Sequence, residues 1–320
     1  MTVLVTGAAG FIGYHVAEAL LARGDSVVGI DNLNDYYDVR LKETRVARLE
    51  RHPGFRFKKI DLSDREAVHA LKDDFLHIVH LGAQAGVRYS LVNPYAYITS
   101  NVMGHVVVLE FARTLKNLRN VVYASSSSVY GGNTKLPFAV GDAVETPQSL
   151  YAATKRSDEL ISHTYAHLYG IPLVGLRFFT VYGPWGRPDM APMLFTAAML
   201  KGEPIRVFNN GEMYRDFTYV DDIVAGVLAA MEARARETPP HKVYNLGNNK
   251  SEKLMDFIAA LEKALGVKAE MRFEPMQPGD VVSTYADIGE TRRALGFKPA
   301  TPISVGVPKF VEWYRSFHGV

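Results

Sequence analysis

Residues 6–13 read TGAAGFIG, and this glycine-rich stretch lies between an apolar run at residues 2–5 and an amphipathic segment that extends to residue 21. The pattern predicts a strand, a phosphate-binding turn and a helix. Gly7, Gly10 and Gly13 permit a tight turn and close approach of the backbone to a pyrophosphate, while the helix N-terminus offers free amides and a favourable dipole. Such a turn can also be purely structural, so the interpretation depends on the segments that follow.

The next apolar run, SVVGID at residues 26–31, ends in Asp31, eighteen residues after Gly13. In a dinucleotide-binding unit, a carboxylate at this position binds the adenosine ribose hydroxyls. An aspartate at the end of a strand also often forms a turn, but the upstream glycines favour ribose binding. Because the carboxylate would repel a 2′-phosphate, the sequence predicts NAD rather than NADP as the cofactor.

Further apolar runs follow, each separated from the next by a segment with helical spacing. They are FRFKKIDL (55–62), HIVHLGA (77–83), NVVYASS (120–126) and PLVGLRFF (172–179). This alternation predicts an α/β fold with a doubly wound parallel sheet of the Rossmann type. We expect an NAD-binding domain at residues 1–180, with a returning segment near 216–247. The shorter elements of residues 181–320 are expected to form a smaller C-terminal α/β domain that binds the substrate.

Residues 125–155 contain a second informative pattern, in which the serine-rich SSSSVYG at 125–131 precedes YAATK at 151–155. Residues four apart share a helix face, so the Lys155 ammonium can lie near the Tyr151 phenol and stabilise its phenolate form. Tyr151 is therefore a candidate general base. Because the chain has 17 tyrosines, about one such Tyr-to-Lys spacing is expected by chance, and the pair gains its meaning from the glycine turn and the serine cluster.

Composition limits the classes of partner. The 320 residues carry 36 Lys and Arg against 34 Asp and Glu, a net charge of +2, and the basic residues are scattered. Nucleic acid is therefore not an expected partner. The absence of cysteine excludes disulfides and thiolate catalysis. No apolar run reaches the length of about 18 residues that a spanning helix needs, and a strand follows Met1 directly, so we expect no membrane segment, no signal peptide and a cytoplasmic location.

Taken together, several separated segments resemble the extended short-chain dehydrogenase/reductase family. Within it, the chain is most similar to the sugar-nucleotide 4-epimerases, and among these to the UDP-glucuronate 4-epimerases. The resemblance covers essentially the whole chain, through TGAAGFIG, GIDNLNDYYDVRLKETR, HLGAQAGVRYS, SSSSVYG, YAATK, RFFTVYGPWGRPDMAP and YRDFTYVDD.

This resemblance implies an NAD-dependent isomerase that inverts carbon 4 of a UDP-sugar by oxidation to a 4-keto sugar, rotation and re-reduction. Ser126 would hydrogen-bond the 4-hydroxyl, Tyr151 would remove its proton, and Lys155 would bind the nicotinamide ribose. The expected cofactor-binding residues are Gly7, Gly10, Phe11, Ile12, Gly13, Asp31, Asn32, Asp61, Leu62, Leu81, Ala83, Gln84, Asn101, Tyr151 and Lys155.

Ser127 and Ser128 distinguish among reactions that begin with this oxidation. Family dehydratases carry an Asp-Glu pair immediately before Val-Tyr-Gly, and the related decarboxylases usually carry a Glu just before it. Hydroxyls bind a carboxylate but are poor proton shuttles at neutral pH. The resemblance therefore implies epimerisation without elimination.

Thr180 bears on the choice of substrate, because hexose epimerases typically have Asn at its place in RFFTVYG. With Ser127, Ser128 and Arg187 it would form a donor-rich pocket for a carboxylate at carbon 6. In the simpler interpretation the serines cap loops and the arginine is solvated. Diphosphate and uridine are expected to bind Arg88, Asn210, Arg215 and Asp280. Arginine suits phosphate through its planar fork, although each of these residues could instead form a surface ion pair.

Two alternative functions stay open. A UDP-glucose or UDP-N-acetylglucosamine 4-epimerase would use the same hydroxyl pocket for a neutral carbon 6. A non-catalytic nucleotide-sensing protein could share the fold, although Ser126, Tyr151 and Lys155 argue against it. His163 and His167 have a metal-like spacing without the Glu of a zinc-protease helix, so we expect no metal. The family resemblance implies a homodimer formed through helices near residues 93–115 and 149–169.

Overall fold

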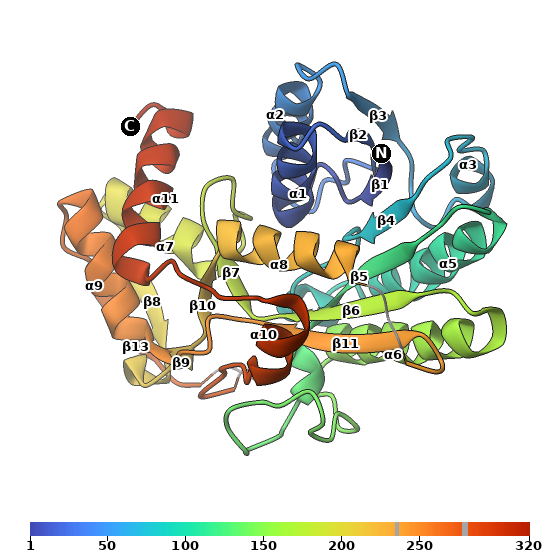
Figure 1. The fold of residues 1–320 in the computed structure, drawn as a ribbon. Helices are drawn as coiled ribbons and strands as arrows, with labels where there is room; N and C mark the ends of the chain where they lie inside the picture. Colours follow the sequence, from blue (N-terminus) through green and yellow to red (C-terminus); the bar gives the residue numbers. More distant parts are fainter. Residues whose placement is uncertain (234–236, 277–280) are drawn as a thin grey trace.

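The structure, a computed structural model, describes residues 1–233, 237–276 and 281–320. At its centre is a seven-stranded sheet with the strand order β11-β6-β5-β4-β1-β2-β3 (Figure 1). All neighbouring strands in it are parallel. The strands are β1 (Thr2–Thr6), β2 (Ser26–Asp31), β3 (Phe55–Lys59), β4 (His77–His80), β5 (Asn120–Ser126), β6 (Leu173–Phe178) and β11 (His241–Leu246). The predicted doubly wound parallel sheet is confirmed.

Helices cover both faces of this sheet. On one face α1 (Phe11–Ala22) contacts α2 (Val39–Leu49) and α8 (Val220–Glu232). On the other face α5 (Gly104–Thr114) contacts α3 (Arg65–His69) and α6 (Leu150–Tyr169). Because both faces are covered, the central strands are apolar almost throughout, and Val3, Leu4 and Val5 of β1 are fully buried.

The chain order reverses between β1 and β4, which lie side by side although α1, β2 and β3 separate them in sequence. In doubly wound sheets, ligands bind outside the carboxyl ends of the strands at such a switch point. The glycine turn leads from the carboxyl end of β1 into α1. The fold therefore places this turn, the end of β4 and the serine cluster after β5 along one edge of the sheet.

A second group of elements lies at this edge. It comprises β7 (Thr180–Tyr182), α7 (Ala191–Lys201), β8 (Ile205–Phe208), η4 (Asn209–Gly211), β9 (Tyr214–Arg215), β10 (Phe217–Tyr219), β12 (Glu252–Lys253), α9 (Leu254–Leu265), β13 (Met271–Glu274) and α11 (Ile303–His318). Helix α10 (Gly289–Leu295) contacts β11 and α8 instead. The strands form three two-stranded sheets, β10-β7, β12-β9 and β13-β8. Four short segments, η1 (Arg88–Leu91), α4 (Pro94–Tyr97), η2 (Ile98–Met103) and η3 (Ser127–Tyr130), each contact α6.

Two elements of the later part of the chain contact the larger sheet or its helices. Helix α8 contacts α1 and β5, and β11 pairs with β6 from His241 to Leu246. The division of the chain into domains at residue 180 stays a prediction. Among the residues that the structure describes, no helix is both long and apolar enough to cross a membrane.

Candidate active site

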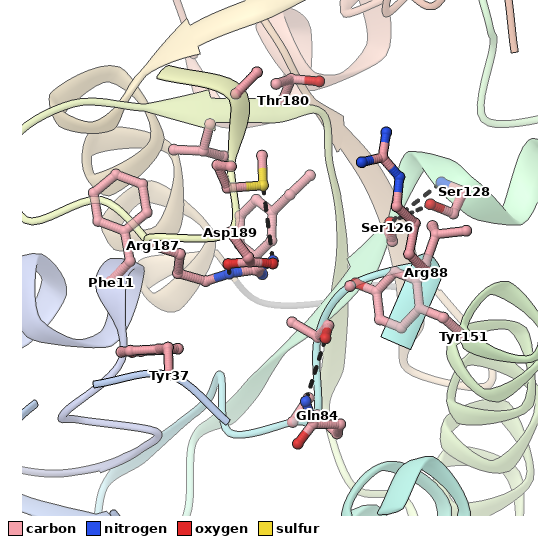
Figure 2. A pocket seen from close by; sticks show the side chains of 18 of the residues that line it. Phe11, Tyr37, Gln84, Arg88, Ser126, Ser128, Tyr151, Thr180, Arg187 and Asp189 are labelled. Atoms are coloured by element: carbon pink, nitrogen blue, oxygen red, sulfur yellow. Dashed lines mark hydrogen bonds and ion pairs between the residues drawn. The ribbon is translucent and has the colours of Figure 1, made fainter. Parts of the chain in front are cut away.

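One large cavity of about 1170 Å³ separates the carboxyl edge of the sheet from the second group of elements. Pockets for a single small molecule usually measure about 300 to 1,000 Å³, so this one has room for more than one ligand. Figure 2 shows Arg187 and Asp189 on one side of the space, with Ser126, Ser128 and Tyr151 opposite them. The cavity therefore joins the glycine turn to the serine cluster.

At one end of the cavity, Asp31 is held by backbone amides at the carboxyl end of β2. Its Oδ2 accepts a hydrogen bond from the Ala9 amide at 3.2 Å, and its Oδ1 accepts one from Leu33 at 2.9 Å. Burial raises the pKa of Asp31 above its usual range, and the amide of Leu33 and the ammonium of Lys42 oppose that rise. The carboxylate is thereby fixed beside the glycine turn.

The glycine turn fits a dinucleotide. A Cβ at Gly13 would lie 2.0 Å from the Gly7 carbonyl oxygen, and Gly7 itself adopts a φ of +70°. The residue that precedes α1, Gly10, makes no side-chain cap to the first amides of the helix. A backbone this close, with helix amides free of a side-chain cap, suits the pyrophosphate of NAD, and Asp31 suits its adenosine ribose.

At the other end, Tyr151 lies in the first turn of α6, which begins after Ser149. The Ser149 hydroxyl accepts a hydrogen bond from the Ala152 amide at 3.1 Å and so fixes the start of the helix. The Tyr151 ring packs edge-on against Tyr97, with centroids 6.0 Å apart. Ser126, at the end of β5, donates to the Ser128 hydroxyl at 3.2 Å. Ser126 and Tyr151 both line the cavity.

Lys155 is 4% exposed and reaches the cavity wall from the next turn of α6. Its Nζ donates to the Ala124 carbonyl at 3.0 Å and to Asp158 Oδ2 at 3.0 Å. The sequence placed this ammonium beside the Tyr151 phenol, whereas the hydrogen bonds identified for it lead to β5 and to a carboxylate on its own helix. That carboxylate was not anticipated.

Arg187 also has a partner that the sequence did not indicate. Its Nε and Nη2 donate to Asp189 at 3.0 and 2.6 Å (Figure 2). The Tyr36 hydroxyl donates a further hydrogen bond to Asp189 at 3.0 Å. Although burial alone raises the pKa of Asp189, the Arg187 guanidinium holds it below its usual range. Arg187 thus lines the cavity with its charge offset by a neighbouring carboxylate.

Most of the predicted site residues line this single cavity. They are Gly7, Gly10, Phe11, Ile12, Gly13, Asp31, Asn32, Asp61, Leu62, Leu81, Ala83, Gln84, Arg88, Ser126, Ser127, Ser128, Tyr151, Lys155, Thr180, Arg187 and Arg215.

Two predicted residues are placed otherwise, and the structure does not describe a third. Asn101 is buried behind the wall, where its side chain exchanges hydrogen bonds of 2.8 and 3.1 Å with the backbone of Gln84. Asn210 is exposed on η4 and is not among the residues lining the cavity. Asp280 lies outside the described residues. In the described ranges, no three His, Cys, Asp or Glu side chains are grouped as a metal site would require.

Sequence reasoning missed Arg45, a fully buried residue of α2. Its guanidinium donates to the carbonyls of Ala9 at 2.8 Å, Trp185 at 2.5 Å and Gly186 at 3.3 Å, and to the Tyr37 hydroxyl at 2.8 Å. Arg45 therefore joins the glycine turn to the loop that carries Arg187. An arginine on the apolar face of the predicted helix is the signal that could have revealed it.

Comparison with known proteins agrees with this geometry. A model of the NAD dependent epimerase/dehydratase family matches residues 3–247. The chain is 49% identical over 333 residues to UDP-glucuronate 4-epimerase 4 of Arabidopsis thaliana, covering 99% of this chain and 76% of that protein. A crystal structure of UDP-glucuronic acid 4-epimerase from Bacillus cereus, in complex with UDP-glucuronic acid and NAD, matches with a TM-score of 0.92 and 35% identity, covering 99% of this chain and 100% of that one.

A neutral-sugar enzyme is also similar in structure. The UDP-glucose 4-epimerase of Thermotoga maritima, solved with UDP-glucose, has a TM-score of 0.89 and 30% identity and covers 99% of this chain and 100% of its own. The family model covers well over half of the sequence, and the fold and the glycine turn agree with it. The chain belongs to the NAD dependent epimerase/dehydratase family.

Proposed function

We propose that the protein is an NAD-dependent 4-epimerase that converts UDP-glucuronate to UDP-galacturonate. The observation that carries this proposal is that the hydroxyl-bearing residues Ser127, Ser128 and Thr180 line the same cavity as Tyr151 and the glycine turn. Hydroxyl donors suit a carboxylate at carbon 6. Positions 127 and 128 lack the carboxylic acids that would shuttle protons for an elimination.

In this proposal the side chains of the protein position the 4-hydroxyl and transfer its proton. Ser126 positions that hydroxyl, and Tyr151 accepts its proton through the phenolate oxygen. The Lys155 ammonium favours the phenolate electrostatically and binds the nicotinamide ribose. NAD, when bound, supplies reversible hydride transfer at carbon 4. Tyr151 then returns the proton to the oxygen at carbon 4 after the sugar has presented its opposite face.

Control of the carboxylate matters because a sugar oxidised at carbon 4 is a β-keto acid. Loss of carbon dioxide is favoured when the breaking bond overlaps the neighbouring carbonyl. Hydrogen bonds from Thr180, Ser127 and Ser128 would hold the carboxylate near the ring plane and keep that bond out of overlap. The same three hydroxyls would then account for both substrate choice and the survival of the intermediate.

A second candidate, a UDP-glucose 4-epimerase, is favoured by one specific observation. Arg187 already makes two hydrogen bonds to Asp189, so its charge is offset before any substrate enters. A guanidinium that is already offset gives the site less reason to prefer a uronate, and neutral donors can also bind a hydroxymethyl group.

We also propose that the enzyme is a homodimer in the cytoplasm. Apolar side chains that are about half exposed or more gather on neighbouring short helices and on α6. They are Leu91, Val92, Tyr95, Ile98, Met103, Leu160, Leu168 and Tyr169. Helix α6 contacts both η1 and η2, and a contiguous apolar surface of this kind is typical of a subunit interface. A chain without cysteine suits a reducing compartment.

Purified protein incubated with NAD and, separately, UDP-glucuronate, UDP-glucose or UDP-N-acetylglucosamine tests the proposal. Chromatographic separation of the epimers should show UDP-galacturonate formed fastest, and Tyr151→Phe is the inactive control. Equal rates on UDP-glucose would favour the second candidate. No product from any of the three would contradict an epimerase with these substrates, and sedimentation analysis would test the dimer.

A further inference from the structure

Asp158 makes a buried ion pair with Lys155 that the proposed reaction does not use. The two residues are 1% and 4% exposed, and Asp158 Oδ2 lies 3.0 Å from Lys155 Nζ. The second carboxylate oxygen, Oδ1, is buried without a hydrogen-bond partner. Leaving a buried carboxylate oxygen unpaired is costly. The unpaired oxygen of Asp158 therefore lowers the free energy of unfolding of the protein.

The histidines that face this pair carry no charge near neutral pH. Burial, followed by the charge of Lys155, lowers the pKa of His105 on α5 to about 3. Burial also lowers the pKa of His80 on β4 well below its usual range. Neither imidazole therefore supplies a positive charge that would compete with Lys155 for the Asp158 carboxylate.

The other titratable groups around the pair are either neutral or already matched. Burial raises the pKa of Tyr123 on β5 well above its usual range, so this phenol stays protonated. Glu159 receives hydrogen bonds at 2.8 Å from both Nε and Nη2 of Arg177 on β6, and one at 3.0 Å from Arg156. Asp158 is thus the carboxylate that directly offsets the charge of Lys155.

We propose that Asp158 is the buried counter-ion of Lys155, a positioning residue that holds the ammonium at the wall of the cofactor site and weakens its stabilisation of the Tyr151 phenolate. The proposal rests on the proposed function, in which Tyr151 is the base. An ammonium with a carboxylate at 3.0 Å exerts a smaller field on a third group than a lone ammonium does. The residue therefore sets the pH range in which Tyr151 works.

Asp158→Asn removes the negative charge and keeps the shape of the side chain. Without it, the field of Lys155 favours the phenolate at lower pH, so the pH profile of kcat should move to lower pH by about one unit. Burial raises the pKa of Asp158 to about 6, with Lys155 opposing. As the pH falls through this raised pKa, the wild type loses the negative charge of Asp158, so the two profiles should differ above it and converge below it.

Two measurements test this, one of them independent of turnover. The first is the pH profile of kcat for wild type and Asp158→Asn. The second is the tyrosinate absorbance of the NAD-loaded protein as a function of pH, taken as the difference between each form and its Tyr151→Phe counterpart. Tyr151 should ionise at lower pH in the variant. If Asp158→Asn does not fold, Asp158→Ala should shift both measurements in the same direction.

Asp74→Asn is the matched control, because Asp74 is exposed before β4, at the amino edge of the sheet, and its substitution should move neither measurement. Superimposable profiles and titrations for wild type and Asp158→Asn, or a shift to higher pH, would overturn the inference while leaving an active epimerase in place. A wild type that epimerises no UDP-sugar would instead refute the proposed function, and the absorbance titration would still decide the role of Asp158.

Discussion

Arg187 and Asp189 are joined by two hydrogen bonds, of 3.0 and 2.6 Å, inside the cavity proposed to bind the sugar. The sequence suggested that the Arg187 guanidinium binds the carboxylate of the substrate. In the structure this guanidinium is instead hydrogen-bonded to the carboxylate of Asp189. The contribution of Arg187 to substrate choice can therefore be measured directly. Substituting Asp189 removes the carboxylate that offsets the Arg187 charge and leaves Arg187 itself in place.

Asp189→Asn should release that charge and lower KM for UDP-glucuronate about tenfold relative to UDP-glucose, since a charge-assisted hydrogen bond contributes about 1.5 to 3 kcal/mol. Arg187→Ala should raise KM for UDP-glucuronate relative to KM for UDP-glucose. Steady-state kinetics on both substrates provide the measurement. Equal changes for the two sugars in both variants would mean that this pair does not contact carbon 6.

Tyr151→Phe should lower kcat by about 100-fold to 10,000-fold, because the variant loses the proton-transferring group. The ring should keep its edge-on contact with Tyr97, so the affinity for NAD and for the sugar nucleotide should change little. Calorimetric titration of both ligands beside the kinetic assay checks the two halves of the expectation. Activity within a few-fold of wild type would assign the proton to another group.

Asp31→Ala should weaken NAD binding and narrow the preference for NAD over NADP. The substitution removes the carboxylate that would bind the ribose hydroxyls, and it also frees the amides of Ala9 and Leu33. Dissociation constants for both cofactors, measured by fluorescence, test the prediction. A wild type with the same affinity for NADP as for NAD would refute the role given to Asp31.

Gly13→Ala should abolish NAD binding and lower the melting temperature, because its Cβ would lie 2.0 Å from the Gly7 carbonyl oxygen. Gly141→Ala is the matched control, since a Cβ there meets nothing within 4 Å. Thermal unfolding with and without NAD compares the two. If Gly13→Ala were still stabilised by NAD, the turn would accommodate a larger side chain at this position than its backbone distances indicate.

Local pattern was sufficient for much of the fold. The turn from Gly7 to Gly13 and the carboxylate of Asp31 lie within one strand, helix and strand unit, so their spacing along the chain fixes their spacing in the fold. The alternation of apolar runs and helical segments likewise predicted the strands of the large sheet. The return of β11 to that sheet was predicted from a single apolar run, HKVYNLGN.

Contacts between distant segments could not be predicted from the sequence. Arg45 meets carbonyls about 140 residues further along the chain, which no periodicity encodes. Asp189 lies only two residues from Arg187, yet its orientation toward that residue depends on the loop backbone and on Tyr36. Asp158 follows Lys155 by three residues on one helix face, so its proximity could be predicted, but its burial depends on β5 and α5, which pack against α6.

The buried guanidinium of Arg45 has a consequence for how long the cofactor stays bound. Its acceptors belong to the glycine turn on one side and to the loop at Trp185 and Gly186 on the other. Separating these two walls would strip a charged group of its acceptors inside the protein, which is costly. We therefore expect slow dissociation of NAD and a long residence time, which suits a reaction that returns its cofactor unchanged after every cycle.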